Sequence, residues 1–112
     1  MALTYSYLHA SQGSDTVFTI TLQNENGVVQ DLTGYSVRSK YARAHSSTNK
    51  YSFLAEVVSP ATDGKITLTL TDSATDAIKP GNYVFDTELI DSGGSVDRVL
   101  EGLLEISPSV TT

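Results

Sequence analysis

The chain contains neither cysteine nor tryptophan, and only two of its 112 residues are histidines. Without cysteine it can form no disulfide and no thiolate metal site. Antibody domains build their core on a tryptophan packed against a disulfide, so that form of core is excluded as well. The core must therefore come from phenylalanine, tyrosine, leucine, isoleucine and valine.

Basic residues are also scarce, with seven lysines and arginines against thirteen acids and a net charge of -6. This balance opposes binding to nucleic acid, which depends on clustered basic side chains. The amino-terminal residues lack the basic and apolar regions of a signal peptide, and no segment approaches the roughly 20 apolar residues that span a bilayer. We therefore expect no nucleic-acid partner, no membrane partner and synthesis in a cytoplasm.

The sequence is rich in short segments in which polar and apolar residues alternate. This period of two is typical of strands with one buried face. They lie at residues 3–9, 16–23, 35–42, 51–58, 65–71, 82–90 and 96–106, with turn residues between them. Their spacing of about ten residues predicts an all-β fold: an immunoglobulin-like antiparallel β-sandwich of seven to eight strands, formed by residues 1–112 as a single domain. A small closed barrel is the alternative.

Individual features refine this expectation. The first segment is expected to be an edge strand. Gly102 interrupts the last strand pattern, which indicates a bulge or a close approach to another backbone.

A short helical turn at residues 72–78 is expected between two of these strands. Asp72 is suited to cap its start, and Ala74, Ala77 and Ile78 are the candidates for its buried side. Pro80 prevents the helix from continuing.

Tyr83 follows Pro80 and Gly81 at the start of the next strand. At the equivalent corner of immunoglobulin-like sandwiches, a tyrosine hydroxyl bonds to upstream backbone, and the residue two positions later enters the core. We therefore predict structural roles for Pro80, Gly81, Tyr83 and Phe85.

The sequence offers no group of residues for catalysis, and we assign no catalytic, cofactor-binding or metal-binding residue. His9 and His45 are far apart and lack metal-ligand spacing. Asp86 and Glu88 share one strand face, where a solvated pair close to Arg98 is favoured over acid–base chemistry.

Charge is unevenly distributed along the chain. Between Leu32 and Ala55 there are four basic residues and no acid, and residues 43–50 within this segment form a polar loop. Such asymmetry can direct contact with an acidic surface. We hypothesise that this segment binds an acidic face of a neighbouring subunit, although a chance distribution is equally compatible. The candidate partner-binding residues are Arg38, Lys40, Arg43, His45 and Lys50.

Four segments together resemble the small immunoglobulin-like virion proteins of tailed bacteriophages. They are QGSD at 12–15, DLTGYSVRSKYAR at 31–43, DGKITLTLTDSATDAIKPGNYVFDTEL at 63–89 and RVLEGLLEISPSVT at 98–111. The resemblance implies a non-enzymatic structural protein without cofactors, which acts as a capsid decoration or as a baseplate or adaptor protein of the tail. It also implies assembly in the host cytoplasm, location in the virion, and contacts with capsid or tail subunits and with copies of itself.

A carbohydrate-binding module for host-surface glycans is the alternative function. Exposed tyrosine rings would stack on sugars, and the candidates are Tyr5, Tyr7, Tyr35, Tyr41 and Tyr51. A third possibility, a small hydrolase, has little support in the pattern.

Overall fold

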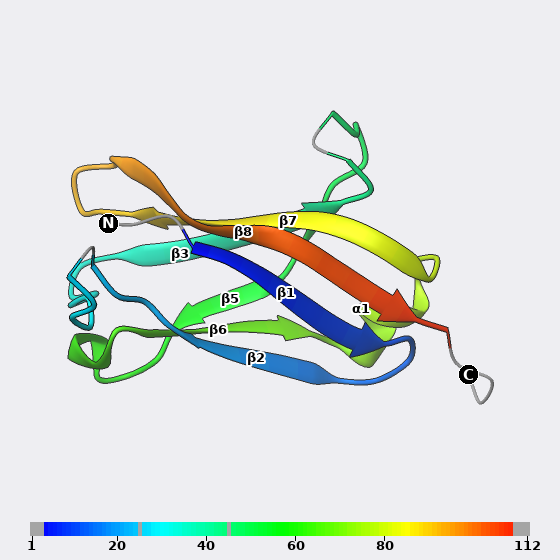
Figure 1. The fold of residues 1–112 in the computed structure, drawn as a ribbon, viewed down its shortest axis with the longest axis horizontal. Coiled ribbons are helices and arrows are strands. Elements are labelled where there is room, and N and C mark those ends of the chain that lie inside the picture. Colours follow the sequence, from blue (N-terminus) through cyan, green and yellow to red (C-terminus); the bar gives the residue numbers. More distant parts are fainter. Residues whose placement is uncertain (1–3, 25, 45, 109–112) are drawn as a thin grey trace.

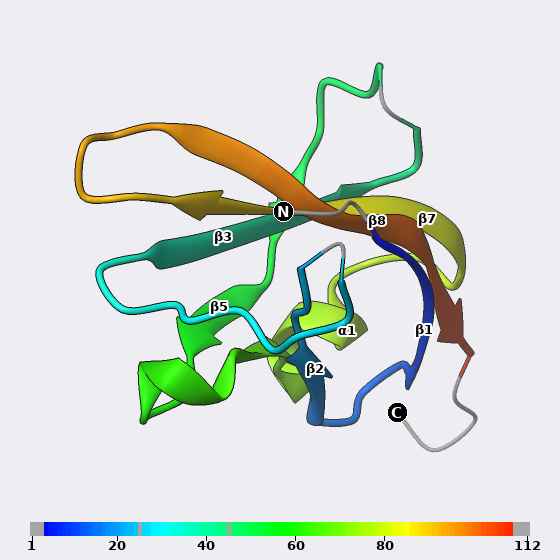
Figure 2. The same ribbon diagram turned by 60° about the vertical axis from the view of Figure 1, so that its left-hand side comes forward.

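The computed structural model describes residues 4–24, 26–44 and 46–108 and shows the expected immunoglobulin-like β-sandwich (Figure 1). One sheet has five strands in the order β1-β8-β7-β3-β4, and the other has three in the order β2-β6-β5. Figure 2 shows the two layers. The strands are β1 (Thr4–Ser11), β2 (Thr16–Thr21), β3 (Ser36–Ala42), β4 (Tyr51–Ser52), β5 (Leu54–Val57), β6 (Lys65–Leu70), β7 (Gly81–Ile90) and β8 (Val96–Ser107). The short helices are η1 (Ala61–Asp63) and α1 (Asp72–Asp76).

The first strand lies at an edge of the five-stranded sheet, as the sequence predicts. It pairs with β8 in parallel, whereas every other strand pair of the sandwich is antiparallel. The two backbones come very close at Gly102, where a Cβ atom would overlap the carbonyl oxygen of Ser6. Gly102 is therefore needed for close contact, and it is not the bulge of this strand.

The bulge lies nearer the start of β8. The register with β7 shifts between Thr87 and Glu88, which pair with Leu100 and Arg98. Val99 is the extra residue, so both Val99 and Leu100 are buried in succession. The shift restores the alternation for the rest of β8 and keeps Leu100, Leu104 and Ile106 on the inner face.

The expected continuous strand at 51–58 is wrong, because the chain changes sheets in the middle of it. β4 pairs with β3 of the large sheet, and β5 pairs with β6 of the small one. Between them the Phe53 amide donates to the carbonyl oxygen of Ser39 at 3.0 Å, and the Phe53 ring is buried. The buried ring at the crossing point anchors both halves of the segment.

Aromatic rings link the two inner faces of the sandwich. The ring of Phe53 lies 6.0 Å from that of Phe85 in an edge-to-face arrangement, and it also contacts Tyr41 at 4.9 Å. Phe18 of the small sheet meets Phe53 at 6.4 Å. Phe85 is fully buried, so the sequence places it correctly in the core. Aliphatic residues fill the remaining space, including Leu32, Ile66, Leu68, Leu70, Leu89, Leu100, Leu104 and Ile106.

The corner between β6 and β7 has the predicted tyrosine geometry. Tyr83 is buried, and its hydroxyl donates to the carbonyl oxygen of Lys79 at 2.6 Å. Burial in the low-dielectric core raises the pKa of Tyr83, because it disfavours the phenolate. The hydrogen bond fixes the turn that contains Pro80 and Gly81 to the first residues of β7.

The helical turn differs from the expectation in its last residue, in its N-cap and in its buried side. α1 ends at Asp76, and its N-cap is Thr71, whose hydroxyl accepts from the Ala74 amide at 3.2 Å. The backbone N–H of Asp72 instead donates to the Asp15 carboxylate at 2.7 Å.

Its buried side is also different from the prediction. Thr75 is fully buried in place of Ala77, which is exposed, while Ile78 is buried as expected. The reason is a long-range contact, since the Thr75 hydroxyl accepts a hydrogen bond from the Gly13 amide at 2.9 Å.

Candidate partner-binding site

The outer face of the five-stranded sheet contains a hollow of about 290 Å³. Residues 43–44 and 46–50 belong to a loop that stands away from the two layers beside this face (Figures 1 and 2). Ala44 and Lys50 line the hollow from the loop side, and β3, β7 and β8 contribute the rest of the lining. Among the strand residues in the lining are Lys40, Val84, Asp86, Glu88 and Arg98.

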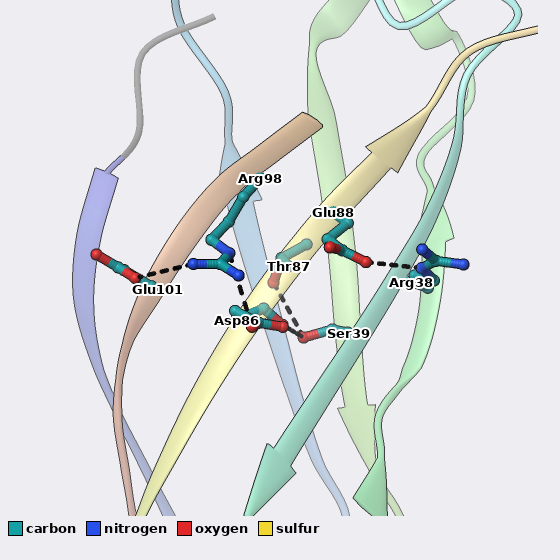
Figure 3. Close-up of polar contacts among 7 residues, drawn as sticks. All are labelled: Arg38, Ser39, Asp86, Thr87, Glu88, Arg98 and Glu101. Carbon is teal, nitrogen blue, oxygen red and sulfur yellow. Dashed lines mark hydrogen bonds and ion pairs between the residues drawn. The ribbon is translucent and has the colours of Figure 1, made fainter. Parts of the chain in front are cut away.

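Strand pairing brings acids and bases together on this face. Arg38 of β3 lies opposite Glu88 of β7, and its Nε donates to Glu88 Oε1 at 2.8 Å (Figure 3). Arg98 of β8 lies 3.7 Å from Asp86 and 4.0 Å from Glu101. The expected pairing of the acidic group with Arg98 is confirmed for Asp86, and Glu88 is paired with Arg38 instead.

Beneath these charges, the hydroxyl of Ser39 connects the two central strands. It donates to the carbonyl oxygen of Asp86 at 2.6 Å and lies 3.0 Å from the hydroxyl of Thr87 (Figure 3). Both side chains are buried. The sequence did not single out this pair, although a serine and a threonine at inward positions of two strands could have signalled it.

The surface formed by the acid-free segment therefore carries acidic residues from a neighbouring strand beside its own basic ones. β7 places Asp86 and Glu88 beside the basic side chains of β3. Lys40 and Lys50 line the hollow, and neither ammonium group forms an ion pair with a described residue. Arg38 is 55% exposed although it pairs with Glu88, so it also stays a candidate for contact with a partner.

Arg43 makes contacts within the chain. Its guanidinium carbon lies 4.5 Å from the centre of the Tyr83 ring, and its Nη2 donates to the carbonyl oxygen of Pro80 at 3.0 Å. Arg43 thus connects the base of the loop to the tyrosine corner. His45 lies outside the described residues.

Two of the five candidate sugar-binding tyrosines are strongly exposed on one strand. Tyr5 and Tyr7 on the outer face of β1 are 67% and 58% exposed. Tyr41 is buried, Tyr35 is half-buried, and Tyr51 is stacked on Tyr41 at 5.4 Å. The rings are thus distributed over the core, the β1 edge and the β4 edge, where Tyr51 is 39% exposed.

Glu105 organises the polar groups next to these rings. The Tyr7 hydroxyl donates to Glu105 Oε1 at 2.5 Å, and this hydrogen bond raises the pKa of Tyr7 because the neutral phenol is the donor. His9 Nε2 lies 3.9 Å from the same carboxylate and also contacts the Ser107 hydroxyl. In the part of the chain that the structure describes, no group of three or more histidines and acids is arranged to hold a metal ion.

Comparisons with known proteins bear on the fold. No protein-family model matches the chain, and no curated protein matches it in sequence. A similar solved structure is the internalin-like protein lmo2027 of Listeria monocytogenes, at 19% identity and a TM-score of 0.50. The match covers 94% of this chain and 28% of that protein. At this identity the likeness is one of fold alone. Among the described residues, no helix is long and apolar enough to cross a membrane.

Proposed function

We propose that the chain is a non-enzymatic structural protein of a tailed-phage virion and binds a neighbouring virion subunit. In this proposal it is a capsid decoration or cement protein, or a baseplate or adaptor protein of the tail. The observation that carries the contact is the hollow with Lys40 and Lys50, which form no ion pair with a described residue. The resemblance to phage virion proteins supports the setting in a virion.

The hollow suits an acidic side chain of a partner. The surrounding acids Asp86 and Glu88 are each engaged by an arginine, so they repel an incoming carboxylate less than free acids do. The chain as a whole has a net charge of -6, which keeps acidic surfaces away from most of it. The two lysines therefore favour one orientation of approach.

Incorporation into particles tests the proposal. The wild-type chain is expected in purified particles at a fixed copy number and position. The double reversal Lys40→Glu/Lys50→Glu should reduce incorporation about tenfold or more, with a stronger effect at low ionic strength. The matched control is Lys79→Glu, an exposed lysine at the tyrosine corner.

Two results would each overturn a different part of the proposed function. Absence of the wild-type protein from purified particles would end the virion proposal. Normal incorporation of the double reversal at moderate salt, with the protein folded, would show that the hollow is not the contact.

Glycan binding remains the second candidate, because Tyr5 and Tyr7 expose two rings on the same face of β1. Aromatic faces of this kind can stack on sugar rings. If the chain binds host-surface glycans, the double substitution Tyr5→Ala/Tyr7→Ala should abolish binding to a glycan array. Tyr51→Ala, which removes a partly exposed ring from β4, should leave it intact. Equal loss in both variants, or no binding by the wild type, would count against this function.

A further inference from the structure

The outer face of the three-stranded sheet has a different character from the lysine hollow. Its alternate residues point away from the core, whereas Phe18, Ile66 and Leu68 point into it. The outward residues are Val17, Thr19 and Thr21 of β2, Lys65, Thr67 and Thr69 of β6, and Leu54 and Glu56 of β5. Four of these eight are threonines, and we name this surface the threonine face.

Apolar side chains lie in one row across the threonine face. Val17 and Leu54 each pair with Thr69 from opposite sides, so the three residues are neighbours. Val17 is 59% exposed and Leu54 is 61% exposed. Apolar groups gathered on a flat sheet face lose unfavourable contact with water when another surface covers them.

The charges of the threonine face indicate which kind of surface covers it. Glu56 lies opposite Thr67 on the neighbouring strand, and Lys65 lies two residues before Thr67. Neither forms an ion pair with another described residue. One acid and one base beside a central threonine are complementary to the same arrangement rotated by a twofold axis.

We propose that the threonine face is the contact between two copies of this chain, related by a twofold axis. The axis lies in the plane of contact, passes through Thr67 and runs diagonally to the strands. In this arrangement Glu56 of each copy meets Lys65 of the other, and the two Val17 side chains meet each other. The strands of the two sheets then cross near a right angle, which is one of the two preferred sheet packings. The proposal does not depend on the role of the lysine hollow, which lies on the opposite face.

The size of the face sets the strength of the contact. Two strands of six residues and one of four cover at most roughly 20 Å by 14 Å, from the rise along a strand and the spacing between strands. This is less than the roughly 800 Å² that each partner buries in a stable complex. We therefore expect a weak dimer, with a dissociation constant on the order of 10⁻⁵ M, which a virion would reinforce by holding copies close together.

Sedimentation equilibrium of the full chain, from micromolar to millimolar concentrations, tests the dimer. Val17→Asp should weaken association at least tenfold, because it places two carboxylates against each other on the axis. The control is Val96→Asp, the same substitution at a valine that is 49% exposed on β8. A chain that remains monomeric up to about 10⁻³ M, well above the expected constant, would overturn the proposal.

A charge exchange tests the orientation. Glu56→Lys and Lys65→Glu should each weaken the dimer, whereas the double exchange Glu56→Lys/Lys65→Glu should restore it, since each copy again offers one acid and one base. Circular dichroism checks that each variant is folded. A dimer that none of these substitutions weakens must use another surface.

The absence of native cysteine allows a second measurement in a variant that keeps the face almost unchanged. Thr67→Cys on the proposed axis should give efficient dimers with a short bismaleimide cross-linker. Thr33→Cys, an exposed threonine before β3, is the control. Equal cross-linking at the two positions would contradict the twofold contact through Thr67.

Discussion

The two outer faces of the sandwich differ although their inner faces follow one pattern. On the five-stranded sheet, acids and bases alternate between neighbouring strands and form the pairs Arg38–Glu88 and Arg98–Asp86. On the three-stranded sheet, the threonine face has one acid and one base that do not pair with described residues. Apart from the hydrogen-bonded Ser39 and Thr87, the buried inward positions of both sheets are apolar, because folding requires it. Outward positions are free of that requirement, so their differences are informative about contacts.

The largest effect is expected from a substitution that displaces the edge strand of the five-stranded sheet and leaves the three-stranded sheet in place. A Cβ atom in Gly102→Ala overlaps the Ser6 carbonyl oxygen, so β1 must move away from β8. We expect a loss of about 2–3 kcal/mol in the free energy of unfolding, the upper range for overpacking. Denaturant unfolding measures this loss, and hydrogen exchange should show faster amide exchange in β1 than in β2.

Gly93→Ala is the matched control, because a Cβ there meets only an ordinary contact at 3.4 Å. It should be nearly neutral. If Gly102→Ala were equally mild, or if it disturbed β2 as much as β1, the two sheets could not be perturbed separately.

A smaller effect is expected at the corner that joins the two sheets. Tyr83→Phe removes the hydrogen bond to the Lys79 carbonyl oxygen and should cost about 1 kcal/mol of unfolding free energy. Tyr51→Phe, on a partly exposed ring for which no hydroxyl hydrogen bond is described, should cost much less. Chemical denaturation of both variants gives the comparison, and equal values would argue against a stabilising corner bond.

The smallest expected effect compares the charges of the two faces directly. A double-mutant cycle at Arg38 and Glu88 should give a coupling energy of about 0.2–1 kcal/mol that decreases with salt, as for other exposed pairs. The same cycle at Glu56 and Lys65 should give almost none at protein concentrations where the chain is monomeric. Similar coupling at both sites would remove the electrostatic difference between the faces.

Local patterns in the sequence were enough to predict much of the fold. Alternation of apolar residues identifies β2, β3, β6 and β7, and the spacing from Pro80 to Tyr83 identifies the corner. These features depend on residues close together in the chain, where side-chain direction follows directly from backbone geometry.

The features that were missed depend on distant partners. The chain leaves one sheet for the other at Phe53, which pairs with the Ser39 carbonyl oxygen, and nothing in the local alternation marks that change. Thr75 is buried because Gly13 reaches it from 62 residues away. The acids beside the basic residues were missed for the same reason, since the register that places Glu88 beside Arg38 is not visible in either strand alone.

The parallel pairing of β1 and β8 has a consequence for how such domains can be joined. The two strands advance together from Thr4 beside Leu100 to Ser11 beside Ser107, so the chain enters and leaves the sandwich in the same direction. The described chain therefore begins at one end of this strand pair, at Thr4, and leaves it at the other, at Ser107. Domains joined through two such strands can be arranged end to end, without a connecting segment that reverses the direction of the chain.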